Sequence, residues 1–166
     1  LGGKIVMHLS TFANYWSNGS FRQGASVFVS DWYESAGGVI QNRPFHPETE
    51  FKNCIVWGNN ASLNDFDELV SNILDPTYYS AQIFQSCALD VQGQDFPYNL
   101  IDSDCTLDQA PPFQSELNRN FRLEGNSTIW NGISSIPPFE ATDVSTDLDG
   151  SPRSTFSPDK GCFERQ

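Results

Sequence analysis

Positive charge is scarce in this sequence. It holds 9 lysines and arginines against 21 aspartates and glutamates, and its formal net charge is −12. No two basic residues are adjacent. Because a nucleic-acid surface needs clustered positive charge, the sequence argues against a nucleic-acid partner. The same charge repulsion disfavours binding to an anionic membrane surface.

Long hydrophobic runs are also missing. No segment approaches the length that crosses a bilayer, so no membrane span is expected, and nothing near Leu1 resembles a signal peptide. Because the chain enters an apolar segment directly after Leu1-Gly2-Gly3, we interpret it as the C-terminal piece of a longer protein. The alternative is a complete small domain with an exposed sheet edge, which natural proteins usually cover.

Metal-binding residues are few and scattered. The sequence has 2 histidines and 4 cysteines, with no C-x-x-C spacing, so neither a metal site nor a cofactor is expected. Only Ser145-x-Asp147-x-Asp149-Gly150 imitates the start of a calcium loop, and Phe156 stands where its bidentate glutamate would be. Calcium is an alternative there. The favoured interpretation is a turn held by pairing between an aspartate and Arg153.

Four segments are predicted to be strands, because apolar residues cluster or alternate in them between turn residues: 4–14, 25–33, 51–59 and 81–90. Superposing Asn14 on Asn59 places Phe12 over Trp57 and Leu9 over Cys54, and superposing Cys54 on Cys87 places Ile55 over Ala88. Stacked parallel strands need such like residues in like positions. The sequence therefore predicts a solenoid, with residues 101–113 as its last irregular turn.

The cysteines fit this stacking in two ways. Adjacent strands lie about 4.8 Å apart, so a bridge between Cys54 and Cys87 is sterically conceivable. Stacked reduced thiols are the favoured interpretation, since free cysteine packs as a small hydrophobic residue.

One helix is predicted within residues 64–74. Phe66, Leu69, Val70 and Ile73 fall at helical spacing, and Asp75-Pro76 ends the pattern. This helix would pack beside the solenoid as an inserted loop.

The segment from 120 to 164 cannot bury a core of its own. Phe121 and Leu123 alternate with polar residues, and Asn131-Gly132 is a turn signal. We therefore expect a single domain in which residues 114–166 lie as a cap across the exposed end of coils formed by residues 1–113.

The same segment carries a resemblance to a known family. Residues 120–132 (NFRLEGNSTIWNG), 147–153 (DLDGSPR) and 158–164 (PDKGCFE) are similar to the C-terminal signature of secreted right-handed parallel β-helix proteins of gut Bacteroidetes. These are often labelled choice-of-anchor Q domain proteins and are pectate-lyase-like. With residues 53–59 (NCIVWGN), the resemblance reaches across most of the chain. Trp130 departs from the usual aspartate, and Lys160 and Cys162 replace the commoner isoleucine and alanine.

The resemblance implies an all-β fold, a right-handed parallel β-helix with one inserted helix and a C-terminal cap. It also implies an extracellular or bacterial cell-surface location and a parent protein that binds or processes glycans. Polysaccharide is therefore the expected partner.

Catalysis of polysaccharide cleavage needs residues that the sequence does not obviously group. A lyase needs a base and a cation that neutralises the uronate. His8 and Lys52 come near matching positions in successive strands, with His8 over Asn53. A hydrolase needs paired carboxylates at set separations, and the acidic residues are predicted in loops or in the helix. We expect a non-catalytic segment, with a β-helical lyase or hydrolase as the alternative.

Aromatic residues are the remaining candidates for ligand contact. Neighbours in an extended segment point to opposite sides, so one member of an aromatic pair can be exposed and stack on a sugar ring. Our candidate carbohydrate-binding residues are Trp16, Trp32, Tyr33 and Trp57. The plainer interpretation is that such rings cover the core. A second alternative function is a surface adhesin or scaffold that binds proteins through the acidic face of the predicted helix.

Overall fold

The computed structural model describes residues 3–15, 24–42, 47–59, 68–91, 104–125, 128–133 and 145–165. Strands dominate these ranges, and most strand pairings in them are parallel. The predicted all-β class is therefore confirmed. The described part of the chain contains no helix that is long and apolar enough to span a membrane.

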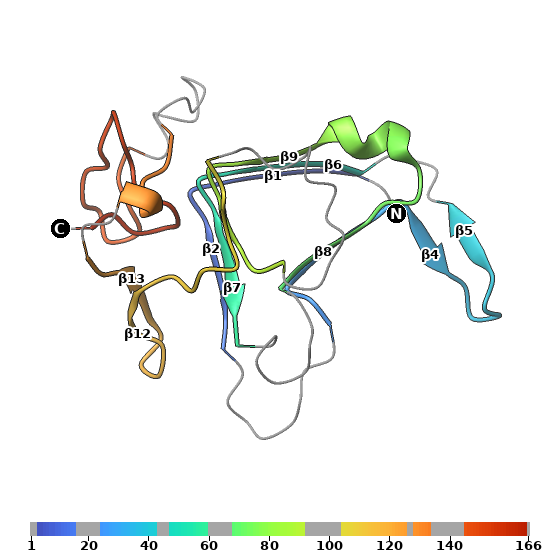
Figure 1. Ribbon diagram of the computed structural model, residues 1–166, viewed down its shortest axis with the longest axis horizontal. Coiled ribbons are helices and arrows are strands. Elements are labelled where there is room, and N and C mark those ends of the chain that lie inside the picture. The colour runs from blue at the N-terminus through green and yellow to red at the C-terminus, as the bar shows by residue number, and fades with distance from the viewer. Residues whose placement is uncertain are drawn as a thin grey trace.

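Three parallel sheets surround a shared interior (Figure 1). The first consists of β1 (Gly3–His8), β6 (Pro47–Lys52) and β9 (Gln82–Gln85). The second consists of β2 (Thr11–Asn14), β7 (Ile55–Gly58), β10 (Ala88–Leu89) and β11 (Thr106–Leu107). The third pairs β3 (Val27–Ser30) with β8 (Leu69–Asn72). Each sheet thus takes strands from successive stretches of the chain.

A sharp corner separates the first sheet from the second at the same place in each stretch. Leu9, Asn53 and Ser86 have φ values of 50°, 53° and 51°, in the left-handed region. One residue in this conformation turns the chain from β1 to β2, from β6 to β7 and from β9 to β10. The segments 4–14, 51–59 and 81–90, each predicted as one strand, are therefore two strands each.

The observed strand pairing corrects the predicted register by one residue, by the same amount on both sides of the corner. Asn14 pairs with Gly58 and Phe12 with Val56, where the sequence alignment had placed Asn59 and Trp57. A slip of one residue moves a side chain to the opposite face of a sheet. The predicted match between Ile55 and Ala88 is confirmed.

The helix predicted within residues 64–74 is wrong where the structure describes it. Residues 69–72 form β8, which pairs in parallel with β3, and residues 60–67 lie outside the described ranges. Leu69 and Ile73 are both buried, so the apolar positions point into the core from an extended chain. A short 3-10 helix, η1 (Pro76–Ala81), follows instead, capped by the side chain of Asp75.

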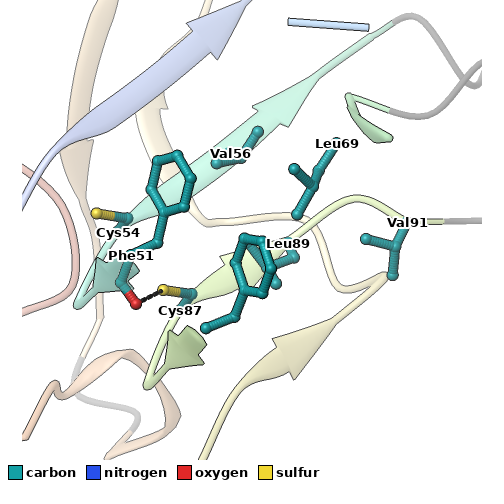
Figure 2. Packing of buried hydrophobic residues seen from close by; sticks show 8 residues of the cluster. Phe51, Cys54, Val56, Leu69, Cys87, Leu89 and Val91 are labelled. Atoms are coloured by element: carbon teal, nitrogen blue, oxygen red, sulfur yellow. Dashed lines mark hydrogen bonds between the residues drawn. The ribbon is translucent and has the colours of Figure 1, made fainter. Parts of the chain in front are cut away.

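The main core lies between the three sheets (Figure 2). The rings of Phe51 and Phe84, which come from paired positions of β6 and β9, stack with centroids 5.5 Å apart. Cys54 and Cys87 are buried beside them, and Cys87 contacts the carbonyl oxygen of Phe51 at 3.4 Å. All four cysteines are free thiols, and burial raises the pKa of Cys87. The thiols are thus stacked core groups rather than a bridge.

The tail covers the outer face of the second sheet. It contains the antiparallel hairpin of β12 (Phe113–Ser115) and β13 (Asn120–Leu123), and the short helix η3 (Thr128–Trp130). Trp130 and Leu123 pack on Ile55 and Trp57 in a second buried cluster. The predicted boundary between the coils (residues 1–113) and the cap (residues 114–166) falls inside this hairpin.

The expected position of the tail across the end of the sheets is therefore corrected. It contacts strands from several stretches of the chain, because the backbone N–H of Cys162 donates to Oγ1 of Thr11 and Nζ of Lys160 donates to Oγ1 of Thr106, each at 3.0 Å. Figure 1 shows the red tail beside β2 and β7. It lies along the flank of the second sheet.

The turn at residues 147–150 is held differently from the prediction. The carboxylate of Asp147 accepts backbone N–H groups from Asp149, Ser151 and Glu164. Burial acts to raise the pKa of Asp147, but these hydrogen bonds outweigh it and the pKa is lowered. Arg153 pairs with Glu164 at 3.5 Å. Backbone donors are therefore the main support of the turn, and the positive charge of Arg153 contributes to the lowered pKa of Asp147.

Candidate functional site

The four aromatic candidates have different surroundings. Trp16 lies outside the described residues. Trp57 is 7% exposed and belongs to the cluster beneath the tail, so its ring has no free face for a sugar. Trp32 and Tyr33 lie together in β4 (Trp32–Glu34), which forms a hairpin with β5 (Ile40–Asn42). Among the candidate rings that the structure describes, those of this hairpin lie nearest the surface.

The two faces of the hairpin are distinct. Trp32 pairs with Asn42 and Tyr33 with Gln41, and residues directly opposite in an antiparallel pair share a face. The hydroxyl of Tyr33 donates to Oε1 of Gln41 at 2.9 Å. The side chains of Trp32 and Asn42 therefore point to one side of the hairpin, and those of Tyr33 and Gln41 point to the other side.

A cavity of ≈ 330 Å³ opens on the side of Asn42. It is lined by Asp31, Asn42, Leu74, Asp75, Pro76 and Tyr78. The hairpin supplies one wall and η1 the other, since Asp75 caps η1 and Tyr78 belongs to it. The carboxylate of Asp31 fixes the two walls to each other by accepting the backbone N–H groups of Leu74 and Asp75, each at 2.9 Å.

This lining combines the groups that bind polyols. The carboxylates can accept hydrogen bonds from hydroxyls, and the amide of Asn42 can both accept and donate them. The ring of Tyr78 is an apolar surface with a polar tip. The sequence reasoning missed Asp31, Asn42 and Asp75 as site residues. The only local signal was Asp75-Pro76 before the pair Tyr78-Tyr79, which reads equally well as a helix end.

A second group of residues gathers on the outer face of the first sheet. His8 pairs directly with Lys52 in the β1–β6 register, one residue from the predicted match. Glu50 lies between them, with its Oε1 at 3.1 Å from Nε2 of His8 and at 2.7 Å from Nζ of Lys52. Glu50 sits on a strand, so the expectation that acidic residues occupy loops or a helix is wrong for this residue.

The charge state of Glu50 limits what this group can do. The hydrogen bond from Lys52 is the main reason that the pKa of Glu50 is lowered; burial opposes it and the contact with His8 adds to it. Glu50 is thus a paired carboxylate and unsuited to donate a proton. A cavity of ≈ 280 Å³ adjoins Glu50, and its lining contains no arginine.

The lowered pKa of Glu50 predicts a pH dependence of stability. Because its folded pKa lies below the unfolded value of about 4.3, the stabilisation is complete above that value and is lost as pH falls through the folded pKa. Glu50→Gln should therefore reduce the loss of stability between about pH 5 and about pH 3. Urea unfolding across this range measures it.

Glu48→Gln is the matched control on the same strand, because Glu48 is exposed and its contact with Lys4 is 3.8 Å. An unchanged acid profile in Glu50→Gln, or the same change in both variants, would contradict the assigned role of Glu50.

A larger cavity of ≈ 460 Å³ lies in the tail. Two arginines line it, but Arg122 is paired with Asp149 and Arg165 with Asp159, and no aromatic residue belongs to the lining. The cavity beside the β4–β5 hairpin is therefore the better candidate site. Among the residues that the structure describes, no group of three or more His, Cys, Asp or Glu is placed to hold a metal ion.

Comparison with known proteins finds no matching family model, no matching curated protein and no matching solved structure.

Proposed function

We propose that the three parallel sheets are coils of a right-handed parallel β-helix and that the tail is its C-terminal covering segment. In-register parallel pairing between successive stretches supports this, as do the one-residue corners at Leu9, Asn53 and Ser86. The resemblance of residues 120–164 to the choice-of-anchor Q family points the same way. On that resemblance the protein is secreted or displayed on a bacterial cell surface.

We infer that this part of the chain binds polysaccharide and does not cleave it. The observation that carries the inference is the cavity that Asp31, Asn42 and Tyr78 line together, next to a hairpin that bears Trp32. Concave sites with a few convergent polar groups and an apolar wall are the usual form of small-ligand sites. The paired, ionised state of Glu50 makes it unsuited to act as a proton donor, which favours binding over turnover.

Tyr78→Ala tests this inference. Loss of the ring should weaken polysaccharide binding about tenfold, or ~1.4 kcal/mol, because stacking of a sugar on an aromatic face is lost. Affinity electrophoresis or calorimetry against a panel of polysaccharides measures the change, with circular dichroism to verify folding.

Tyr33→Ala is the matched control, since Tyr33 is 43% exposed and lies on the opposite side of the hairpin. An equal loss of polysaccharide affinity in Tyr78→Ala and Tyr33→Ala would mean that the polysaccharide does not bind in this cavity. If the wild-type chain binds no polysaccharide of the panel, the inference is refuted.

A second candidate is a β-helical lyase or hydrolase. The observation in its favour is that His8, Glu50 and Lys52 meet beside a cavity. Cleavage of a panel polysaccharide that is abolished in His8→Ala would establish it. The adhesin alternative was placed on the acidic face of the expected helix; residues 69–72 of that segment form a strand, and residues 60–67 lie outside the described ranges.

A further inference from the structure

Three of the four cysteines form a file beside the second sheet. The strands β7, β10 and β11 pair in register, and a cysteine directly precedes each of them: Cys54, Cys87 and Cys105. All three are free thiols in this structure. We propose that Cys87 and Cys105 are a redox pair, which a small-molecule disulfide oxidises to a bridge between the starts of β10 and β11. This pair is independent of the proposed polysaccharide binding.

The backbone holds the two cysteines at the separation that a bridge requires. Adjacent parallel strands lie about 4.8 Å apart, within the range of about 4.4–6.8 Å that the Cα atoms of a disulfide span. The backbone N–H of Thr106 donates to the carbonyl oxygen of Cys87 at 2.7 Å, so the strands are hydrogen-bonded beside the thiols. The backbone N–H of Cys87 also donates to Sγ of Cys105 at 3.3 Å. The Cys105 sulfur is therefore already turned toward its neighbour.

Exposure selects this pair over Cys54 with Cys87. A disulfide reagent must first reach one thiol, and Cys54 and Cys87 are each 0% exposed, whereas Cys105 is half-buried. Within the file, the neighbour of Cys105 is Cys87. Sγ of Cys87 contacts the carbonyl oxygen of Phe51 at 3.4 Å, so a rotation about the Cα–Cβ bond of Cys87 is the movement that the bridge requires.

A buried lysine lies beside the more accessible thiol. Nζ of Lys160 donates to the carbonyl oxygen of Asp104 and to Oγ1 of Thr106, each at 3.0 Å, and these residues flank Cys105. The positive charge of Lys160 favours the thiolate of Cys105, which is the form that attacks a disulfide. The contact with Cys87 and burial outweigh it and raise the pKa of Cys105. The pair therefore stays reduced until a disulfide reagent is supplied.

The reaction is two successive thiol–disulfide exchanges. The thiolate of Cys105 attacks one sulfur of the reagent, whose S–S bond breaks and releases one reagent thiolate. The thiolate of Cys87 then attacks the Cys105 sulfur of this mixed disulfide, forms the bridge and releases the second reagent thiolate. The two cysteines lose two electrons and two protons, and the reagent is reduced to two thiols.

Oxidised glutathione is the probe that tests the pair. The intact reduced chain is incubated with it in a mildly alkaline native buffer, which increases the thiolate fraction. The product should be lighter by two hydrogen atoms, carry no glutathione, and yield on digestion a peptide pair joined through Cys87 and Cys105. Circular dichroism before and after the reaction verifies that the fold is retained.

Stability gives a second readout. The bridge joins residues 18 positions apart and restricts the unfolded chain, so oxidation should raise the urea midpoint. Cys54→Ala keeps the pair and should show the same gain on oxidation. Cys105→Ala removes one partner and should show none. An equal gain in both variants would contradict the proposal.

The wild-type chain alone is sufficient to overturn the proposal, whether or not the variants fold. Glutathione attached to Cys105 without a bridge, a bridge through Cys54 or Cys162, or no reaction of the folded chain would each do so. All of these outcomes leave the proposed polysaccharide binding unaffected.

Discussion

Phe51→Ala should destabilise the protein by about 3–5 kcal/mol, which is typical for removing a buried phenylalanine ring. Phe51 is 1% exposed and lies at the centre of the core shared by the three sheets. Its ring stacks on Phe84 and meets Phe12 edge to face, with centroids 6.1 Å apart. The substitution therefore removes contacts between three successive stretches of the chain at once.

This loss is large compared with the total stability of a typical domain, about 5–15 kcal/mol. Urea unfolding followed by circular dichroism measures it. Phe156→Ala is the matched control: Phe156 is 88% exposed, and its removal should change stability by less than about 0.5 kcal/mol. Similar midpoints for the two variants would show that the sheets do not enclose Phe51.

The stacking of strands could be predicted from the sequence, but the corners could not. Apolar residues recur in equivalent positions, which is why the match of Ile55 with Ala88 is correct. A corner made by one left-handed residue leaves little trace, since neither Leu9 nor Ser86 is a residue type enriched in that conformation.

The register error of one residue has a different origin: aligning Asn14 with Asn59 moved the whole stretch by one residue. The pairing offset before the corner, His8 with Lys52, is the same as after it, Asn14 with Gly58.

The helix error has a different cause. Leu69 and Ile73 lie four residues apart, which suits one face of a helix, and both are buried as that pattern requires. The extended conformation of residues 69–72 is determined instead by parallel pairing of β8 with β3. The partner residues lie 42 positions earlier in the chain, as the pair Val27 and Leu69 shows. Tertiary pairing of this kind overrides local propensity and cannot be seen in a short window of sequence.

None of the six residues that line the candidate cavity is among the four predicted carbohydrate-binding residues. Trp32, which stands out in the sequence as part of an aromatic pair, lies in the adjoining hairpin. The cavity itself depends on Asp31 accepting hydrogen bonds from Leu74 and Asp75, across 43 and 44 positions. The sequence alignment placed His8 near Lys52, opposite Asn53. The structure pairs His8 with Lys52, so the predicted register was wrong by one residue.

Gly161→Ala should release the tail from the second sheet. Gly161 has φ +88°, and a Cβ atom there would lie 2.5 Å from Oγ1 of Thr11 and 2.9 Å from Cδ1 of Ile55. Left-handed strain costs about 1–2 kcal/mol, and the steric overlap adds about 1–3 kcal/mol. The overlap also disturbs the hydrogen bond from the neighbouring Cys162 to Thr11 and the bond from Gly161 to the carbonyl of Asn53.

Gly125→Ala isolates the steric part of this effect. Gly125 also lies in the tail and has φ +80°, but a Cβ atom there would meet nothing within 4 Å. Both variants therefore carry similar backbone strain, and only Gly161→Ala should expose Trp57 and Trp130, which are buried between the tail and the second sheet. Tryptophan fluorescence and limited proteolysis of the tail report this exposure. Identical behaviour of the two variants would mean that the tail does not pack along the flank of the second sheet, and a position across the end of the sheets would again be the better description.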